Sequence, residues 1–166
     1  HLLKQADVST KVGRRRDLSE KVGIYASSEG KDLIVEYSDQ TSERLSAIDE
    51  KGDILFWGGN TAIHVFTLDF IVQLNSKGFS LPFHRAVKNA DIFDPVGGFM
   101  TVQAWKFETF VFDAIPLAQR TACIEVARHE EFSPIKNSEG TDSLETACAD
   151  MSALYSSWVR QAGISI

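Results

Sequence analysis

Three polar residues in this sequence have side chains suited to binding a polar small molecule. Glu36 and Asn60 each follow a stretch that we expect to be a β-strand, and Lys136 lies beyond the last such stretch. A carboxylate accepts hydrogen bonds from hydroxyl groups, an amide both donates and accepts them, and a lysine ammonium neutralises phosphate. Together with the backbone at Gly58 and Gly59, this set favours a polyhydroxylated, phosphorylated small molecule as ligand.

Each of these residues also has an ordinary structural interpretation. A Gly-Gly-Asn sequence usually forms a turn, and strand-end glutamates and single lysines are usually solvated. His64 stands in an apolar run, where a hydrogen-bonded core histidine is favoured over a catalytic base. His84 and His129 form no metal-ligand pattern with it, and Ser38 has no evident histidine partner, so the sequence disfavours a metal site and a hydrolase triad.

Short apolar strands and amphipathic helices alternate along the chain. We expect a hairpin from Lys21–Ala26 and Leu33–Tyr37, and further strands at Ile54–Trp57, Ala62–Phe66, Phe83–Lys88 and Ala122–Val126. We expect helices at Ser42–Ile48, after Thr67, from about Trp105, and after an Asp142-x-x-Glu145 capping box. The helix from Trp105 should kink or stop near Ile115, because Pro116 follows. This alternation predicts an α/β domain with a mostly parallel sheet, in which ligands bind beyond the carboxyl ends of the strands.

Composition narrows the class of protein. The 166 residues fit one domain or most of one. Seventeen Lys and Arg against twenty-three Asp and Glu give a formal net charge of −6, which disfavours nucleic acid as a partner. No apolar run has the length of a membrane span, and Cys123 and Cys148 lack metal-ligand or disulfide-framework spacing, so we expect a cytoplasmic protein.

An ordered set of short motifs resembles the eukaryotic-type UDP-N-acetylglucosamine pyrophosphorylases and their bacterial uridylyltransferase relatives. The combination of FVFD with EFSPIKN about twenty residues later, in register with VEYS and GGN upstream, carries this resemblance from about Lys11 to Gly163. Its members are Val22-Gly23, Val35-Glu36-Tyr37-Ser38, Gly59-Asn60 with His64 and Phe66, Lys106, Phe110-Val111-Phe112-Asp113, and Glu131 to Asn137.

The resemblance implies a GT-A-like, Rossmann-type nucleotidyltransferase that joins UTP to N-acetylglucosamine 1-phosphate and releases pyrophosphate. It implies that Glu36 and Asn60 hold sugar hydroxyls beside the backbone of Gly23. Phe110 and Phe112 would form a wall on the N-acetyl side, although two helical positions two residues apart do not share a face. Lys136 would meet the phosphate as the catalytic residue, with Mg²⁺ as the implied cofactor.

The family's glycine-rich nucleotide loop, its lysine and its metal-binding aspartate have no counterpart in this sequence. We therefore expect residues 1–20, with the basic run Arg14–Arg16, to be a loop or tail, and residues 21–166 to be the sugar-binding half of a partial catalytic domain. The missing N-terminal half would supply the UTP site and the Mg²⁺ ligands, and 1–166 alone would be inactive. Two alternatives are a UDP-glucose or UDP-galactose type of pyrophosphorylase and a noncatalytic sugar-nucleotide-binding module.

Overall fold

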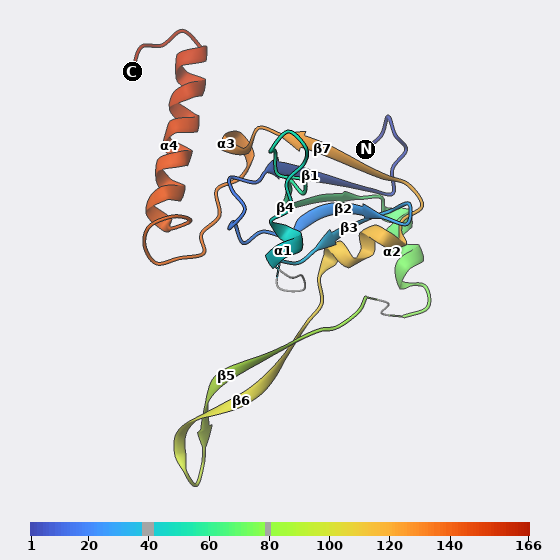
Figure 1. Cartoon of the computed structure of the whole chain (residues 1–166), viewed down its shortest axis with the longest axis vertical. Helices are drawn as coiled ribbons and strands as arrows, with labels where there is room; N and C mark the ends of the chain where they lie inside the picture. The colour runs from blue at the N-terminus through green and yellow to red at the C-terminus, as the bar shows by residue number, and fades with distance from the viewer. Residues whose placement is uncertain (38–41, 79–80) are drawn as a thin grey trace.

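The computed structural model describes residues 1–37, 42–78 and 81–166. Its centre is a five-stranded sheet with the strand order β3-β2-β4-β1-β7, flanked by helices (Figure 1). The strands are β1 (Val8–Arg14), β2 (Ile24–Ser28), β3 (Lys31–Val35), β4 (Gly58–Phe66) and β7 (Thr121–Val126). The predicted α/β class and the first hairpin are confirmed.

The sheet is mixed, so the expectation of a mostly parallel sheet is wrong. Strand β1 is parallel to β7, whereas the β1–β4, β2–β4 and β2–β3 pairs are antiparallel. The predicted strand at Ile54–Trp57 is also wrong, because only Ile54 forms a bridge, to Ile48. The strand that follows begins at Gly58, so Asn60 lies inside β4 and not beyond a strand end.

Residues 1–20 are not only a loop or tail, because β1 lies within them and pairs with β4 and β7 near the middle of the sheet. Polar side chains hid this strand in the sequence. Ser9 and Thr10 are buried, and their hydroxyl groups form hydrogen bonds with His1 at 2.9 Å and with His64 at 3.1 Å. Buried hydroxyl groups are tolerated when they are hydrogen-bonded in this way.

The helices are α1 (Ser42–Leu45), α2 (Leu68–Asn75), the 3-10 helix η1 (Val111–Leu117), α3 (Arg128–Glu131) and α4 (Leu144–Gln161). Thr67 caps α2 as expected, since its hydroxyl accepts a hydrogen bond from the amide of Phe70. The capping box of α4 is formed by Ser143 and Thr146, one residue beyond the predicted pair. Helices α2 and η1 supply the core residues Phe70, Phe112, Ala114 and Ile115, which cluster with Val8 and Ile34 of the sheet.

A long antiparallel hairpin replaces the helix that we expected from Trp105. Strands β5 (His84–Asp94) and β6 (Gly98–Glu108) pair along their whole length and project away from the sheet (Figure 1). The apolar and aromatic residues of this segment fit a β-strand as well as one face of a helix, so their spacing led us to predict a helix. The remaining helix, η1, contains Pro116 and ends at Leu117.

One end of the sheet collects the segments that carry the candidate residues. The register places the last residues of β1 opposite the first residues of β4 and beside the end of β7, while the start of β2 pairs with the end of β3 and with Gly59. Helices α3 and α4 follow β7 at this same end (Figure 1). Because the strand directions are mixed, the starts of β2 and β4 and the ends of β1, β3 and β7 all lie at this end of the sheet.

Candidate sugar-phosphate site

Gly23, Glu36 and Asn60 come together at this end of the sheet, as the sequence predicted. The amide of Asn60 donates a hydrogen bond of 2.7 Å to the carbonyl of Gly23. A Cβ atom placed on Gly23 would lie 3.0 Å from Oε1 of Glu36 and 3.7 Å from Cβ of Asn60. Gly23 is thus a close-approach glycine, and the carboxylate of Glu36 fills the space that a side chain there would occupy.

The side chain of Asn60 is held by a local distortion of β4. Its Oδ1 accepts a hydrogen bond of 3.0 Å from the amide of Ala62, which has a φ of 60° in the left-handed region. The β1–β4 register shifts between Thr10 and Val12, opposite this distortion. Because Oδ1 already accepts a hydrogen bond and Asn60 is only 8% exposed, its amide nitrogen is the group suited to donate to a ligand.

Lys136 lies close to the segment that leads through Gly23 into β2. Its Nζ donates a hydrogen bond to the carbonyl of Lys21, and its amide donates to the carbonyl of Asp142 at 2.6 Å. Lys136, Lys21 and Tyr37 line one open cavity of about 910 Å³. Tyr37 directly follows Glu36, so this cavity joins the candidate catalytic lysine to the chain segment that carries the candidate sugar-binding carboxylate.

The charge of Lys136 has no carboxylate partner among the described residues that line this cavity. Arg16 pairs with Asp142 at 2.7 Å and with Glu20 at 3.5 Å, and Arg128 pairs with Glu20 at 2.5 Å. Among the residues that the structure describes, no carboxylate forms an ion pair with Lys136. An exposed ammonium held only by a neutral carbonyl can neutralise a phosphate group.

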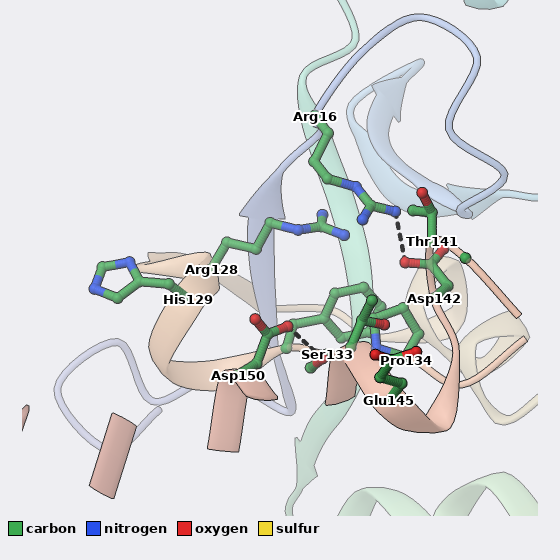
Figure 2. A pocket seen from close by; sticks show the side chains of 12 residues that line it. Arg16, Arg128, His129, Ser133, Pro134, Thr141, Asp142, Glu145 and Asp150 are labelled. Carbon is green, nitrogen blue, oxygen red and sulfur yellow. Dashed lines mark hydrogen bonds and ion pairs between the residues drawn. The ribbon is translucent and has the colours of Figure 1, made fainter. Parts of the chain in front are cut away.

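A second cavity, of about 830 Å³, adjoins the first and shares Arg16, Thr141 and Asp142 with it. Figure 2 shows Arg16 reaching across to Asp142, and Ser133 bonded to Asp150 of α4 at 2.7 Å. Sequence reasoning missed Asp142 as a site residue. The sequence indicated only that Asp142 begins a helix-capping box. The structure shows that Asp142 connects Arg16 to the backbone of Lys136.

Phe110 and Phe112 are arranged differently from the expectation. Their rings stack at a centroid distance of 4.8 Å and an interplanar angle of 12°, so the inference that they cannot share a face is wrong. Phe110 precedes η1 in an extended conformation, so the two rings do not occupy two positions of one regular helix and the helical spacing rule does not apply to them. Phe112 is 8% exposed and belongs to the core cluster with Ile34, and Phe110 packs against that cluster.

The stacked pair lies beside the strand that leads to Glu36. Helix η1 packs against β3, and Thr121, which follows η1, donates a hydrogen bond to Asp32 near the start of β3. Helix η1 and β3 therefore run in opposite directions, and the first turn of η1 lies beside the later residues of β3. Phe110 also contacts the ring of His84 at 4.7 Å, and His84 pairs with Asp113 at 2.8 Å.

The remaining candidates lie outside this arrangement. The ring of His64 is bonded to Thr10, and burial lowers its pKa, which is the behaviour of the hydrogen-bonded histidine that we favoured. Ser38 lies outside the described residues. Among the residues of known placement, no group of three or more His, Cys, Asp or Glu side chains could hold a metal ion, and no helix is long and apolar enough to cross a membrane.

Comparison with known proteins agrees with the geometry. The chain is 34% identical to the UDP-N-acetylglucosamine pyrophosphorylase of Saccharomyces cerevisiae, over 95% of its own length and 35% of the relative. It is also 34% identical to the UDP-N-acetylglucosamine diphosphorylase 2 of Arabidopsis thaliana, over 96% of its length and 32% of the relative. The chain is a homologue of the UDP-N-acetylglucosamine pyrophosphorylases.

Solved structures show the same similarity. The uridine diphosphate N-acetylglucosamine pyrophosphorylase of Trypanosoma brucei superposes with a TM-score of 0.80 at 25% identity, covering 97% of this chain and 32% of that one. A UDP-glucose pyrophosphorylase of Leishmania major shares the fold alone, at a TM-score of 0.61 and 19% identity over 92% of this chain and 32% of that one. No family model matches the chain. It spans about a third of the length of the curated relatives that it matches.

Proposed function

We propose that the protein is a uridylyltransferase that joins UTP to N-acetylglucosamine 1-phosphate, and that the residues described above bind the sugar phosphate. The observation that carries this proposal is the convergence of Gly23, Glu36 and Asn60 at one end of the sheet, beside the uncompensated ammonium of Lys136. A carboxylate acceptor, an amide donor and a free cation are the groups that sugar hydroxyls and a phosphate require.

The reaction needs no activated nucleophile. A phosphate oxygen of the sugar phosphate attacks the α-phosphorus of UTP in line, the new P–O bond forms, and the bond to the departing pyrophosphate breaks. Positioning and charge stabilisation supply most of the rate in such transfers. Lys136 would offset the negative charge of the attacking phosphate, and Glu36 and Asn60 would fix the sugar ring so that this oxygen faces UTP.

Mg²⁺ belongs to this proposal only as an implied cofactor. It would neutralise charge on the phosphates of UTP when bound. The described residues provide no cluster of metal ligands, so every role assigned here belongs to side chains that hold the sugar phosphate. A cytoplasmic location is also part of the proposal, and the free state of Cys123 and Cys148 supports it.

N-Acetylglucosamine 1-phosphate is favoured over glucose or galactose 1-phosphate on two grounds. The named relatives at 34% identity are enzymes of UDP-N-acetylglucosamine, whereas the likeness to UDP-glucose pyrophosphorylase extends to the fold alone. The stacked rings of Phe110 and Phe112 also supply an apolar surface beside β3, where the methyl group of an acetamide could pack.

Steady-state kinetics of the full-length protein would test this function. With UTP, a divalent cation and each sugar phosphate in turn, we expect pyrophosphate release to be fastest with N-acetylglucosamine 1-phosphate. Lys136→Ala should lower the rate by about 100-fold, the usual cost of losing one preorganised donor. Lys77→Ala removes an exposed lysine beyond α2 and should leave the rate unchanged.

Two results would contradict the proposal. A rate for Lys136→Ala within threefold of wild type would remove Lys136 from the site. Tight binding of a UDP-sugar without any turnover would favour the noncatalytic sugar-nucleotide-binding module.

A further inference from the structure

Arg15 is a buried cation at the end of β1 that takes no part in the site described above. It is only 6% exposed. Its neighbours in the basic run are both paired with carboxylates, Arg14 with Glu125 and Arg16 with Asp142, each at 2.7 Å. In the described part of the chain, Arg15 forms no ion pair and its Nε has no hydrogen-bond partner. Such a costly buried charge calls for an explanation.

The guanidinium of Arg15 binds three backbone carbonyls from three separate segments. Nη1 donates to the carbonyls of Leu45 at 3.0 Å and Phe56 at 3.3 Å, and Nη2 donates to that of Leu18 at 2.9 Å. A planar guanidinium holds several acceptors at fixed angles, which an ammonium group on a flexible stem does not. Arg15 therefore fixes the three segments relative to one another.

Each of these segments is joined along the chain to one candidate sugar-binding residue. Leu18 lies in the loop that leads to Gly23, and Phe56 precedes the strand that carries Asn60. Leu45 ends α1 and lines one cavity together with Arg15 and Tyr37, the residue after Glu36. The guanidinium thus joins the segments that carry Gly23 and Asn60 to helix α1, which lies near Tyr37.

The aliphatic part of Arg15 supports the same region. A Cβ atom on Gly59, next to Asn60, would lie 3.6 Å from Cγ of Arg15 and 3.3 Å from Cγ1 of Val22, next to Gly23. The amide of Arg15 donates to the carbonyl of Trp57 at 2.8 Å. Arg15 and Tyr37, which follows Glu36, also line a common cavity. Packing and hydrogen bonding therefore both connect Arg15 to the site.

We infer that Arg15 is a positioning residue that sets the spacing of Gly23, Glu36 and Asn60 through the carbonyls of Leu18, Leu45 and Phe56. This inference rests on the proposed function for its effect on sugar binding. The hydrogen bonds that support it belong to the fold and do not depend on the identity of the sugar.

Kinetics of Arg15→Met and Arg15→Lys in the full-length protein would test the inference. Methionine keeps much of the volume and loses all the donors, so we expect the KM for the sugar phosphate to rise by about tenfold while the KM for UTP changes by less than twofold. Lysine keeps the charge and can reach only part of the acceptor set, so it should restore the KM partly. Arg14→Met, which removes the exposed neighbouring arginine, is the matched control and should behave as wild type.

Hydrogen–deuterium exchange separates this inference from the proposed function. In Arg15→Met, exchange should rise together in peptides that cover residues 16–24, 43–47 and 55–61, whatever substrate the protein uses. Inactivity of the wild type with every sugar phosphate would overturn the proposed function and leave the exchange result as the test of Arg15. Unchanged exchange in Arg15→Met would overturn the positioning role. So would a KM for the sugar phosphate that stays within twofold of wild type while the protein is merely less stable. If Arg15→Met does not fold, the same exchange and KM criteria apply to Arg15→Lys.

Discussion

Arg16 and Asp142 form an ion pair of 2.7 Å that joins the end of β1 to the loop before α4. The carbonyl of the same Asp142 accepts a hydrogen bond of 2.6 Å from the amide of Lys136. Hydrogen bonding to Asp142 and attraction by Glu20 raise the pKa of Arg16 despite the opposing effect of desolvation, which is the largest single contribution. The guanidinium of Arg16 therefore helps to hold the backbone of Lys136, the candidate catalytic lysine, through Asp142.

Breaking this pair should weaken catalysis through Lys136. We expect Arg16→Met to lower kcat/KM for the sugar phosphate by about tenfold, less than Lys136→Ala, because a displaced lysine retains part of its effect. In the double variant Arg16→Met/Lys136→Ala the losses should not add, since both act on one group. Arg120→Met, whose distance to Asp7 is 4.0 Å, serves as the control. Full additivity in this double-mutant cycle would show that Arg16 acts independently of Lys136.

Gly23→Ala should impair sugar binding by a steric route. The new methyl group would lie 3.0 Å from Oε1 of Glu36 and 3.0 Å from Cγ2 of Ile34, tighter than most such contacts, so these side chains must shift slightly. We expect the KM for the sugar phosphate to rise about tenfold, a cost of roughly 1.4 kcal/mol, with the KM for UTP unchanged.

Gly58→Ala is the matched control for Gly23→Ala. A Cβ atom there meets its nearest neighbours at 3.8 Å, an ordinary contact distance, and both glycines are buried. Equal effects of the two substitutions on the sugar-phosphate KM would mean that the close approach of Gly23 to Glu36 has no functional importance.

Asn60→Asp would separate the two roles of the Asn60 side chain. Aspartate keeps an oxygen that can accept the hydrogen bond from Ala62, but it replaces the amide donor with a negative charge. We expect sugar-phosphate binding to weaken by about 1–3 kcal/mol, the cost of an unpaired polar group in a binding site. Thermal unfolding should change less for Asn60→Asp than for Asn60→Ala, which also loses the contact with Ala62. Retained sugar affinity in Asn60→Asp would exclude the amide as a ligand donor.

The sequence predicted that Gly23, Glu36 and Asn60 lie close together, because short motifs locate these candidate residues without knowledge of strand direction. Glu36 directly follows β3, as expected, and the alternation of Ala122–Val126 identified β7, which begins one residue earlier. Strand β1 could not be found in this way, because its buried Ser9 and Thr10 look like surface residues until their partners His1 and His64 are placed. Its central position also explains why the expected parallel sheet is mixed.

Contacts between distant segments explain the other differences. Nothing local to Arg15 indicates that it would be buried against the carbonyls of Leu18, Leu45 and Phe56, and its neighbours Arg14 and Arg16 are charged surface residues. The 105–118 segment combined apolar spacing with Pro116, and pairing with β5 decided in favour of a strand over its first part. Tertiary pairing overrides a short periodic signal of this kind.

His64 should make the stability of the protein depend on pH below neutrality. Desolvation lowers the pKa of its ring, whose Nδ1 lies 3.1 Å from the hydroxyl of Thr10 and whose Nε2 is buried with no hydrogen-bond partner among the described residues. The folded state therefore binds this proton less readily than the unfolded state, whose histidine pKa is about 6.5. The stabilising contribution is fully present above that pH and is lost as the pH falls toward the lower pKa of the folded state.

Urea unfolding at pH 7.5, 6.5 and 5.5 would measure this dependence. We expect the free energy of unfolding of the wild type to fall from pH 7.5 to pH 5.5 more steeply than that of His64→Gln, because glutamine offers hydrogen-bonding groups to Thr10 without titrating. His129→Gln removes a histidine whose side chain is 82% exposed and should keep the wild-type slope. Parallel curves for wild type and His64→Gln would mean that the ring titrates alike in the folded and unfolded states, contrary to its burial beside Thr10.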